Sequence, residues 1–232
     1  MLVAGGTASA EAAAISHTGG VHNYTGESLS YSSSSGDVIV ASGGDFRLNT
    51  QINIGDSNTS DININAYGGI FALKNGHVTL NAENITINST AEEGSYAALW
   101  AQNNSVNADG RPVEDRASIV INANNTTIVS NNNAIVAMSN GIIGINGNLT
   151  VEANNAILAR GDAIININES GSGTVKMVGN VNFNYDGPTS GTNVDAIINI
   201  NLNNADSYWT GNTITSWRGA TLPPGEEKLT VS

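Results

Sequence analysis

Two aspartates are the best candidates for catalytic chemistry in this sequence. Asp162 and Asp195 begin the two copies of a repeated heptapeptide, Asp-Ala-Ile-Ile-Asn-Ile-Asn. Stacked copies would bring the two carboxylates together, and a glycoside hydrolase needs such a pair about 5 to 9.5 Å apart. Acids at the start of a strand are more often turn residues that accept hydrogen bonds from local amides. We therefore interpret this acidic pair as structural and expect no enzyme; a carbohydrate-active lyase or hydrolase is the alternative.

Other catalytic and metal-binding patterns are incomplete. The chain has no Cys and 3 His, and His17, His22 and His77 lack the spacing of metal ligands. The run Gly-Asp-Ser at 55–57 is similar to a serine-protease nucleophile segment, but Asn58 follows it where Gly is needed. The glycine-rich calcium repeat is also absent. We expect no metal and no cofactor.

The charge balance argues against nucleic acid as a partner. The net charge is −12 with only 8 Lys and Arg, whereas binding to phosphates needs a basic surface. No apolar run reaches the roughly 18 to 20 residues that cross a bilayer, so we expect no membrane span in the visible chain. Residues 1–10 end in Ala8-Ser9-Ala10, a small-x-small pattern typical of signal peptides. We interpret them as a possible remnant of such a leader.

Internal repeats organise the rest of the chain. Four segments align on an alanine and alternate apolar with polar residues, which is the period of a half-buried strand. The interval from Ala137 to Ala159 is 22 residues, enough for three short strands and three bends. That length predicts one coil of a solenoid. The aligned segments are Ile70–Leu73, Leu99–Gln102, Ile135–Met138 and Ile157–Arg160.

Further strands are expected in each coil. A second set carries Val78, Ile119, Ile143 and Ile165, and a third carries the pairs Ile85/Ile87, Leu149/Val151 and Val181/Phe183. Asparagines that follow the second strand should stack into a structural ladder of amides. These are Asn81, Asn122, Asn146, Asn168 and Asn201.

The fold that these patterns predict is all-β: a right-handed, single-stranded parallel β-helix with irregular N- and C-terminal caps. The right hand follows the general preference of parallel crossovers. We expect an N-terminal cap or irregular lead-in at 11–36, the parallel β-helix at 37–204, and a C-terminal cap and tail at 205–232. Extra residues at 91–96, 106–116 and 186–193 should leave the coils as loops.

The sequence resembles the passenger regions of bacterial autotransporters, particularly the pertactin-like kind. The resemblance covers roughly residues 36–211 and is carried by the Ala-Ile-x-Ala coils, the Asn-rich turns, the lack of Cys and the run Leu202–Gly211. It implies a protein that is exported through the outer membrane and is secreted or held at the bacterial cell surface. It also implies a translocator barrel downstream, which is not part of this sequence.

One outward stripe is the candidate binding surface. If the aligned Ile, Leu and Ala positions face the core, the intervening positions face outward, where apolar residues often indicate an interaction site. The alternative is that the loop at 106–116 covers them. A rigid rod with a repetitive surface favours an adhesin or surface scaffold with multivalent contacts to a host surface protein, a glycan or a second copy. The stripe consists of Phe71, Trp100, Val136 and Leu158, with Met138 beside them.

Overall fold

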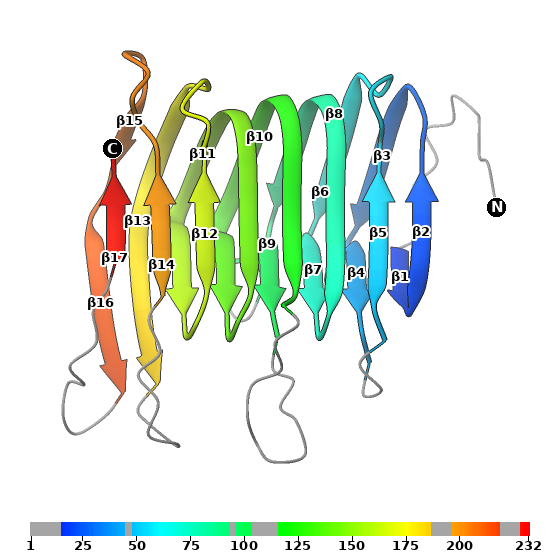
Figure 1. Cartoon of the computed structure of the whole chain (residues 1–232), viewed down its shortest axis with the longest axis horizontal. Helices are drawn as coiled ribbons and strands as arrows, with labels where there is room; N and C mark the ends of the chain where they lie inside the picture. Colours follow the sequence, from blue (N-terminus) through cyan, green and yellow to red (C-terminus); the bar gives the residue numbers. More distant parts are fainter. Residues whose placement is uncertain (1–14, 45–47, 93–95, 104–115, 187–195, 219–227) are drawn as a thin grey trace.

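The computed structural model describes residues 15–44, 48–92, 96–103, 116–186, 196–218 and 228–232. In these ranges the regular secondary structure consists only of β-strands, and the strands pair in parallel. The prediction of an all-β chain is therefore confirmed for the described residues. The strands lie across the long axis of the molecule (Figure 1). The described part contains no helix that is long and apolar enough to cross a membrane.

The described strands form three parallel ladders, and the chain visits ladders 1, 2 and 3 in turn. Ladder 1 contains β1 (Ile15–Thr18), β4 (Ile39–Ser42), β7 (Ile70–Leu73), β9 (Ala97–Gln102) and β16 (Thr213–Arg218). Ladder 2 contains β2 (Gly20–Tyr24), β5 (Thr50–Ile54), β12 (Ile164–Ile167), β14 (Ile197–Ile200) and β17 (Lys228–Val231). Ladder 3 contains β3 (Ser28–Ser33), β6 (Asp61–Ala66) and β15 (Tyr208–Thr210).

Four long strands bend from one ladder into the next. β8 (Gly76–Ser89) belongs to ladders 2 and 3, and β13 (Val175–Asp186) to ladders 3 and 1. β10 (Ser118–Met138) and β11 (Ile142–Arg160) pass through all three ladders. We call one traverse of the three ladders a pass.

Alternation of apolar and polar residues decides which side chains enter the core. In β10 and β11 the alternating Ile119, Ile121, Ile143 and Ile145 are at most 1% exposed, while Asn122 and Asn146 are exposed. Buried residues of all three ladders belong to one hydrophobic core. The predicted alanine alignment is confirmed: Ala72, Ala101, Ala137 and Ala159 occupy one register of ladder 1 and are fully buried.

The structure corrects the expected third set of strands. Val181 and Phe183 pair with Ile157 and Ala159 in ladder 1, not with ladder 3. Val175 and Met177 of the same strand occupy the ladder 3 positions, next to Leu149 and Val151. The error arose because apolar residues alternate with the same period in both parts of β13.

Regular strands also extend outside the expected limits of 37–204. The segment 15–33, expected to be irregular, forms β1, β2 and β3, which pair with β4, β5 and β6. On the C-terminal side, β15, β16 and β17 continue the three ladders. The expected leader at 1–10 and most of the expected loops, including 106–115 and 187–193, lie outside the described residues.

The expected ladder of asparagine amides exists for three of its five members. Asn146 Nδ2 donates to Asn122 Oδ1 at 2.9 Å, and Asn122 Nδ2 donates to Asn81 Oδ1 at 3.0 Å. Asn168 departs from the ladder because its backbone is left-handed, with φ 53°. Its buried side chain instead bonds to both backbone groups of Gly173. Asn201 Oδ1 accepts from the backbone N–H of Asn203.

Candidate functional site

The expected stripe lies on the outer side of ladder 1. Phe71, Trp100, Val136 and Leu158 follow one another in register, and Met138 lies beside them opposite Gln102. The Phe71 and Trp100 rings are 5.6 Å apart between centroids and tilted by 57°. Trp100 Nε1 donates to Gln102 Oε1 at 3.1 Å. The stripe is therefore continuous in register, with two aromatic rings in contact.

Exposure along the stripe is uneven. Phe71, Trp100, Leu158 and Met138 are half-buried, but Val136 is only 2% exposed. Val136 thus departs from the expectation that every member presents its side chain to a partner. It is the smallest member and lies in register between Trp100 and Leu158. The covering loop considered as an alternative, 106–116, lies outside the described residues except for Arg116.

The structure places one member of the acidic pair. Asp162 is half-buried at the edge where the chain passes from ladder 1 to ladder 2. Its backbone oxygen accepts a 3.4 Å hydrogen bond from Arg116 Nη1. Asp195 lies outside the described residues, although the strands after the two aspartates, β12 and β14, do pair in parallel. The pair therefore stays a prediction.

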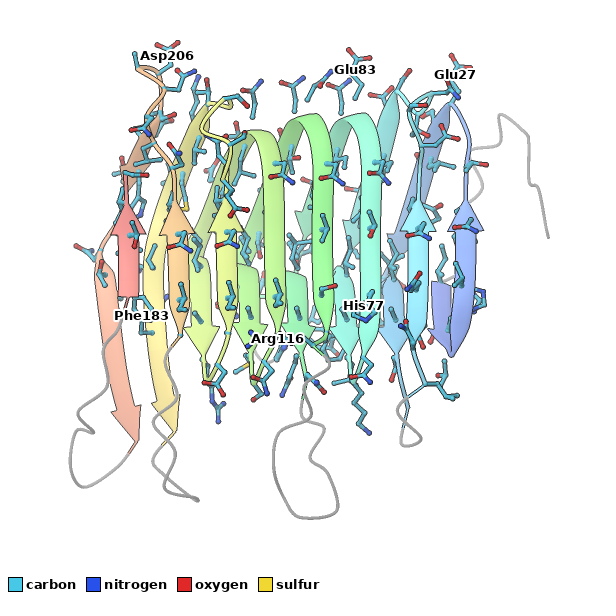
Figure 2. All side chains as sticks on the ribbon, viewed as in Figure 1. Glu27, His77, Glu83, Arg116, Phe183 and Asp206 are labelled. Carbon is cyan, nitrogen blue, oxygen red and sulfur yellow. The ribbon has the colours of Figure 1, made fainter. Side chains whose placement is uncertain are left out.

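Three acidic side chains lie on one edge of the molecule. Glu27, Glu83 and Asp206 lie along the edge where the chain passes from ladder 2 to ladder 3, which we call the 2–3 edge (Figure 2). His77 and Arg116 lie toward the opposite end of the ladder 2 strands in the same view. An anionic ligand would thus meet repulsion at the 2–3 edge.

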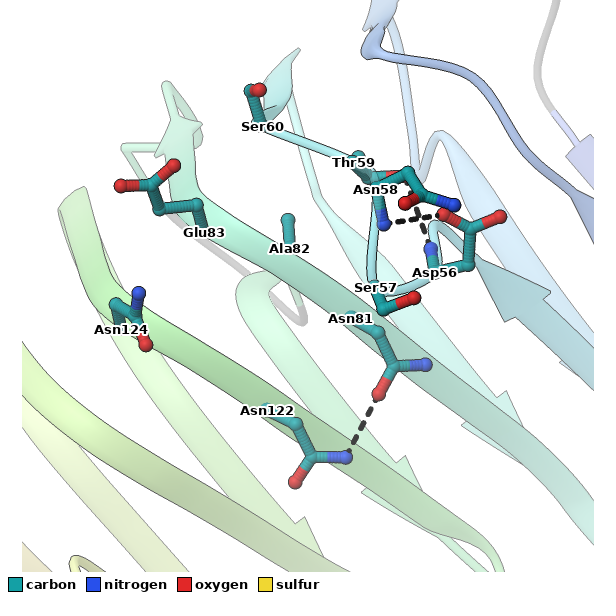
Figure 3. A pocket seen from close by; sticks show the side chains of 10 residues that line it. All are labelled: Asp56, Ser57, Asn58, Thr59, Ser60, Asn81, Ala82, Glu83, Asn122 and Asn124. Carbon is teal, nitrogen blue, oxygen red and sulfur yellow. Dashed lines mark hydrogen bonds between the residues drawn. The ribbon is translucent and has the colours of Figure 1, made fainter.

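A pocket of about 330 Å³ opens on the 2–3 edge. One wall is the turn 56–60 between β5 and β6, and the rest is formed by Asn81, Glu83, Asn122 and Asn124 with neighbouring residues of β8 and β10 (Figure 3). The lining carries carboxylates, amides and hydroxyls, with no Lys, Arg or aromatic side chain. Such groups can hydrogen-bond a polar ligand but cannot stack against a ring or neutralise an anion.

Each of the three histidines contacts another side chain. His17 and His22 are stacked, with ring centroids 3.5 Å apart, and His17 Nε2 shares a 2.6 Å hydrogen bond with the Tyr24 hydroxyl. His77 Nδ1 bonds to Ser118 Oγ at 2.8 Å. Within the described ranges no three His, Cys, Asp or Glu side chains are grouped so that they could hold a metal ion.

Comparison of the chain with models of known protein families found no match. Comparisons with curated proteins and with solved structures also found none.

The pocket is the feature that the sequence patterns did not predict. The run 55–57 is similar only to an incomplete protease motif, and no sequence pattern marks Glu83 or Asn124. One signal was available: the run 55–60 interrupts the alternating pattern, whereas the corresponding bends in β8 and β10 are short. A long turn that lies beside short bends projects beyond them and leaves a hollow at its side.

Proposed function

We propose that this chain is a right-handed parallel β-helix that acts as an exported surface adhesin or scaffold. Repeated passage through ladders 1, 2 and 3, with side chains of all three in one core, supports the solenoid. The general preference of parallel crossovers supports the right hand. Each pass adds only neighbouring contacts, as in other repeat proteins, so the rod is suited to display rather than to a deep catalytic cleft.

The observation that carries the binding function is the apolar stripe of ladder 1. Half-buried Phe71, Trp100, Leu158 and Met138 recur on successive passes, where solvated strands usually carry polar residues. Aromatic and Met side chains are enriched at the centre of protein interfaces. The proposed partner is therefore an apolar patch on a host surface protein, and contacts repeated along the rod add avidity.

The test is adhesion of protein-coated beads to cultured epithelial cells, with and without protease treatment of the cells. The parent protein should adhere to untreated cells and lose adhesion when surface proteins are removed. The double variant Phe71→Ser/Trp100→Ser should reduce adhesion roughly tenfold or more, since aromatic anchors dominate interface energetics. The matched control is Val129→Ser/Val178→Ser, which removes two exposed apolar side chains of ladder 3.

Thermal melting separates binding from folding. A contact surface predicts lost adhesion with a melting temperature close to that of the control variant. If the stripe variant instead melts several degrees lower and adheres as well as the control, the stripe is structural and the proposal fails. Adhesion that survives protease treatment of the cells also contradicts it, because the partner is then not a protein.

A further inference from the structure

The 2–3 edge contains three short bends between two longer turns, a stretch that we call the trough. The turn 55–60, between β5 and β6, and the turn 168–174, between β12 and β13, both project from the edge (Figure 1). Between them β8, β10 and β11 bend from ladder 2 to ladder 3 without a loop. We call the three bends the floor of the trough and the two turns its walls; the described hollow is the pocket beside the first wall.

Buried side chains hold both walls in place. In the first wall, Thr59 is 3% exposed; its Oγ1 accepts from the backbone N–H of Asp56 at 3.0 Å and donates to the Gly26 carbonyl at 2.8 Å. Asp56 Oδ1 accepts from the backbone N–H of Asn58 at 2.8 Å. In the second wall, fully buried Asn168 bonds to the carbonyl and the N–H of Gly173 at 2.7 and 2.9 Å. The walls are thus fixed by the protein itself.

Two rows of amides line the floor. One row is Asn81, Asn122 and Asn146; the other is Asn84, Asn125 and Asn148, whose amides are linked at 3.0 Å per step. Each link uses one N–H of the donor and one lone pair of the acceptor, but a primary amide has two of each. The rows therefore present oriented donors and acceptors that repeat about every 4.8 Å.

Unpaired polar groups gather where the floor meets the first wall, at the pocket of about 330 Å³ (Figure 3). The Ser57, Glu83 and Asn124 side chains line it, and none of the three has a hydrogen-bond partner among the described residues. Glu83 and Asn124 are exposed. Their backbone is held in strands or beside the hydrogen-bonded turn, so the three groups stay at one pocket and can meet a ligand that supplies hydroxyl groups.

We propose that this trough binds a neutral oligosaccharide, with the pocket as its principal subsite. Vicinal hydroxyls match the alternating donors and acceptors of carboxylates and amides. The carboxylates Asp56 and Glu83, on a chain of net charge −12, disfavour uronates, phosphates and sulfates. Three passes span roughly 10 Å of floor, room for a short saccharide. The site lies on the 2–3 edge, not on the ladder 1 stripe, and does not depend on the adhesin proposal.

The test is titration of the ¹⁵N-labelled chain with neutral glucan, mannan and galactan tetrasaccharides, followed by NMR. At least one should bind with a dissociation constant in the range of about 0.1 to 10 mM, typical of a shallow polar site. Amide side-chain signals of Asn81, Asn122 and Asn124 should shift. The double variant Glu83→Ala/Asn124→Ala should weaken binding at least tenfold. Both side chains are exposed and have no hydrogen-bond partner among the described residues, so the variant should fold as the parent does.

The matched control is Glu27→Ala, which removes an exposed acid from the same edge outside the trough. It should leave the dissociation constant unchanged. Tetragalacturonate and calcium chloride alone serve as separate probes. The proposal is overturned if no neutral saccharide binds, if tetragalacturonate binds as tightly as the neutral probe, if calcium alone shifts the same signals, or if the double variant binds like the control. None of these results depends on Phe71 or Trp100, so failure here is distinct from failure of the adhesin proposal.

Discussion

The first pass of the chain and the middle passes use the same ladders but fill the interior differently. In ladder 2, Tyr24 occupies the register that Ile54, Leu80 and Ile121 occupy in later passes. His22 likewise occupies the register that Ile52, Val78 and Ile119 occupy in later passes. The middle interior is aliphatic, whereas the first pass brings rings with polar groups to the same positions. Register alone therefore does not determine the chemistry of an inward position.

Position in the stack explains the difference. Among the described strands, β1, β2 and β3 pair on one side only, with β4, β5 and β6. The inward His22 and Tyr24 cover the next aliphatic layer but are only half-buried, which suits residues with an apolar body and a polar tip. Tyr31 of the same pass is 7% exposed, and burial, with a smaller effect of Tyr24, raises its pKa to about 12.

Truncation of matched inward side chains should give the largest difference between the two regions. Ile121→Ala leaves a cavity in a fully packed layer and should lower the free energy of unfolding by about 3 to 4 kcal/mol. Tyr24→Ala removes a half-buried ring that water can replace, so its cost should be less than half as large. Urea unfolding followed by circular dichroism measures both. Equal losses would show that the first pass is packed as tightly as the centre.

Glycines at bends should show the same contrast on a smaller scale. Gly147 has φ 92°, and a Cβ there would lie 1.9 Å from the Ala123 carbonyl oxygen of the preceding pass. Gly36 of the first pass has φ 80° but open space around it. Gly147→Ala should therefore cost about 2 to 3 kcal/mol, and Gly36→Ala only the backbone strain of about 1 kcal/mol. Similar costs in urea unfolding would mean that strain, not stacking, determines both.

Two buried threonines, one in the middle passes and one in β5 beside the first pass, test whether polar groups are satisfied. Thr126 occupies a ladder 3 register shared with Ile85 and Leu149 and is 2% exposed. Its Oγ1 has no hydrogen-bond partner in the part of the chain that the structure describes. Thr126→Val should raise the free energy of unfolding by about 1 kcal/mol, because an unpaired hydroxyl leaves the core. Thr50, next to the first pass, accepts from the Gly19 N–H and donates to the Ser42 carbonyl.

Thr50→Val is accordingly the matched control and should destabilise by about 1 to 2 kcal/mol. The experiment should therefore find changes of opposite sign in the free energy of unfolding for the two Thr-to-Val variants. If Thr126→Val destabilises as well, then its hydroxyl has a partner in solution, such as a buried water, and the middle core is less uniformly apolar than its neighbours indicate.

The sequence predicted the strand register correctly where a residue pattern was compatible with only one arrangement. The Ile-x-Ala repeat predicted the register of ladder 1 because an interior that admits little change of volume keeps small residues aligned. The sequence patterns predicted the wrong ladder for Val181 and Phe183, because apolar residues alternate in the same way in both parts of β13. They also placed Asn168 in the amide ladder, whereas its left-handed backbone turns the side chain inward. The pocket could not be predicted from residue types, because it results from the difference in length between adjacent turns.

Lowering the pH should destabilise the first pass before the middle passes. We expect this effect on stability to be smaller than those of the substitutions above. Burial, with a further contribution from His22, lowers the pKa of His17 below its ordinary value of 6.5. The unfolded chain therefore binds this proton more readily than the folded chain does. The stabilising contribution is complete above pH 6.5 and is lost as the pH falls toward the lowered pKa of the folded state.

Burial of the ring is the main cause, and the His22 imidazole, stacked at 3.5 Å, adds to it; His17 Nε2 also shares a hydrogen bond with the Tyr24 hydroxyl. Hydrogen exchange of backbone amides between about pH 7 and pH 5, corrected for intrinsic rates, should show protection falling in β1 and β2 while β10 and β11 keep theirs. His17→Gln should remove most of this pH dependence, and the control His77→Gln should retain it. A uniform loss across all passes, or an unchanged profile in His17→Gln, would mean that the stacked histidines do not set the acid stability of the first pass.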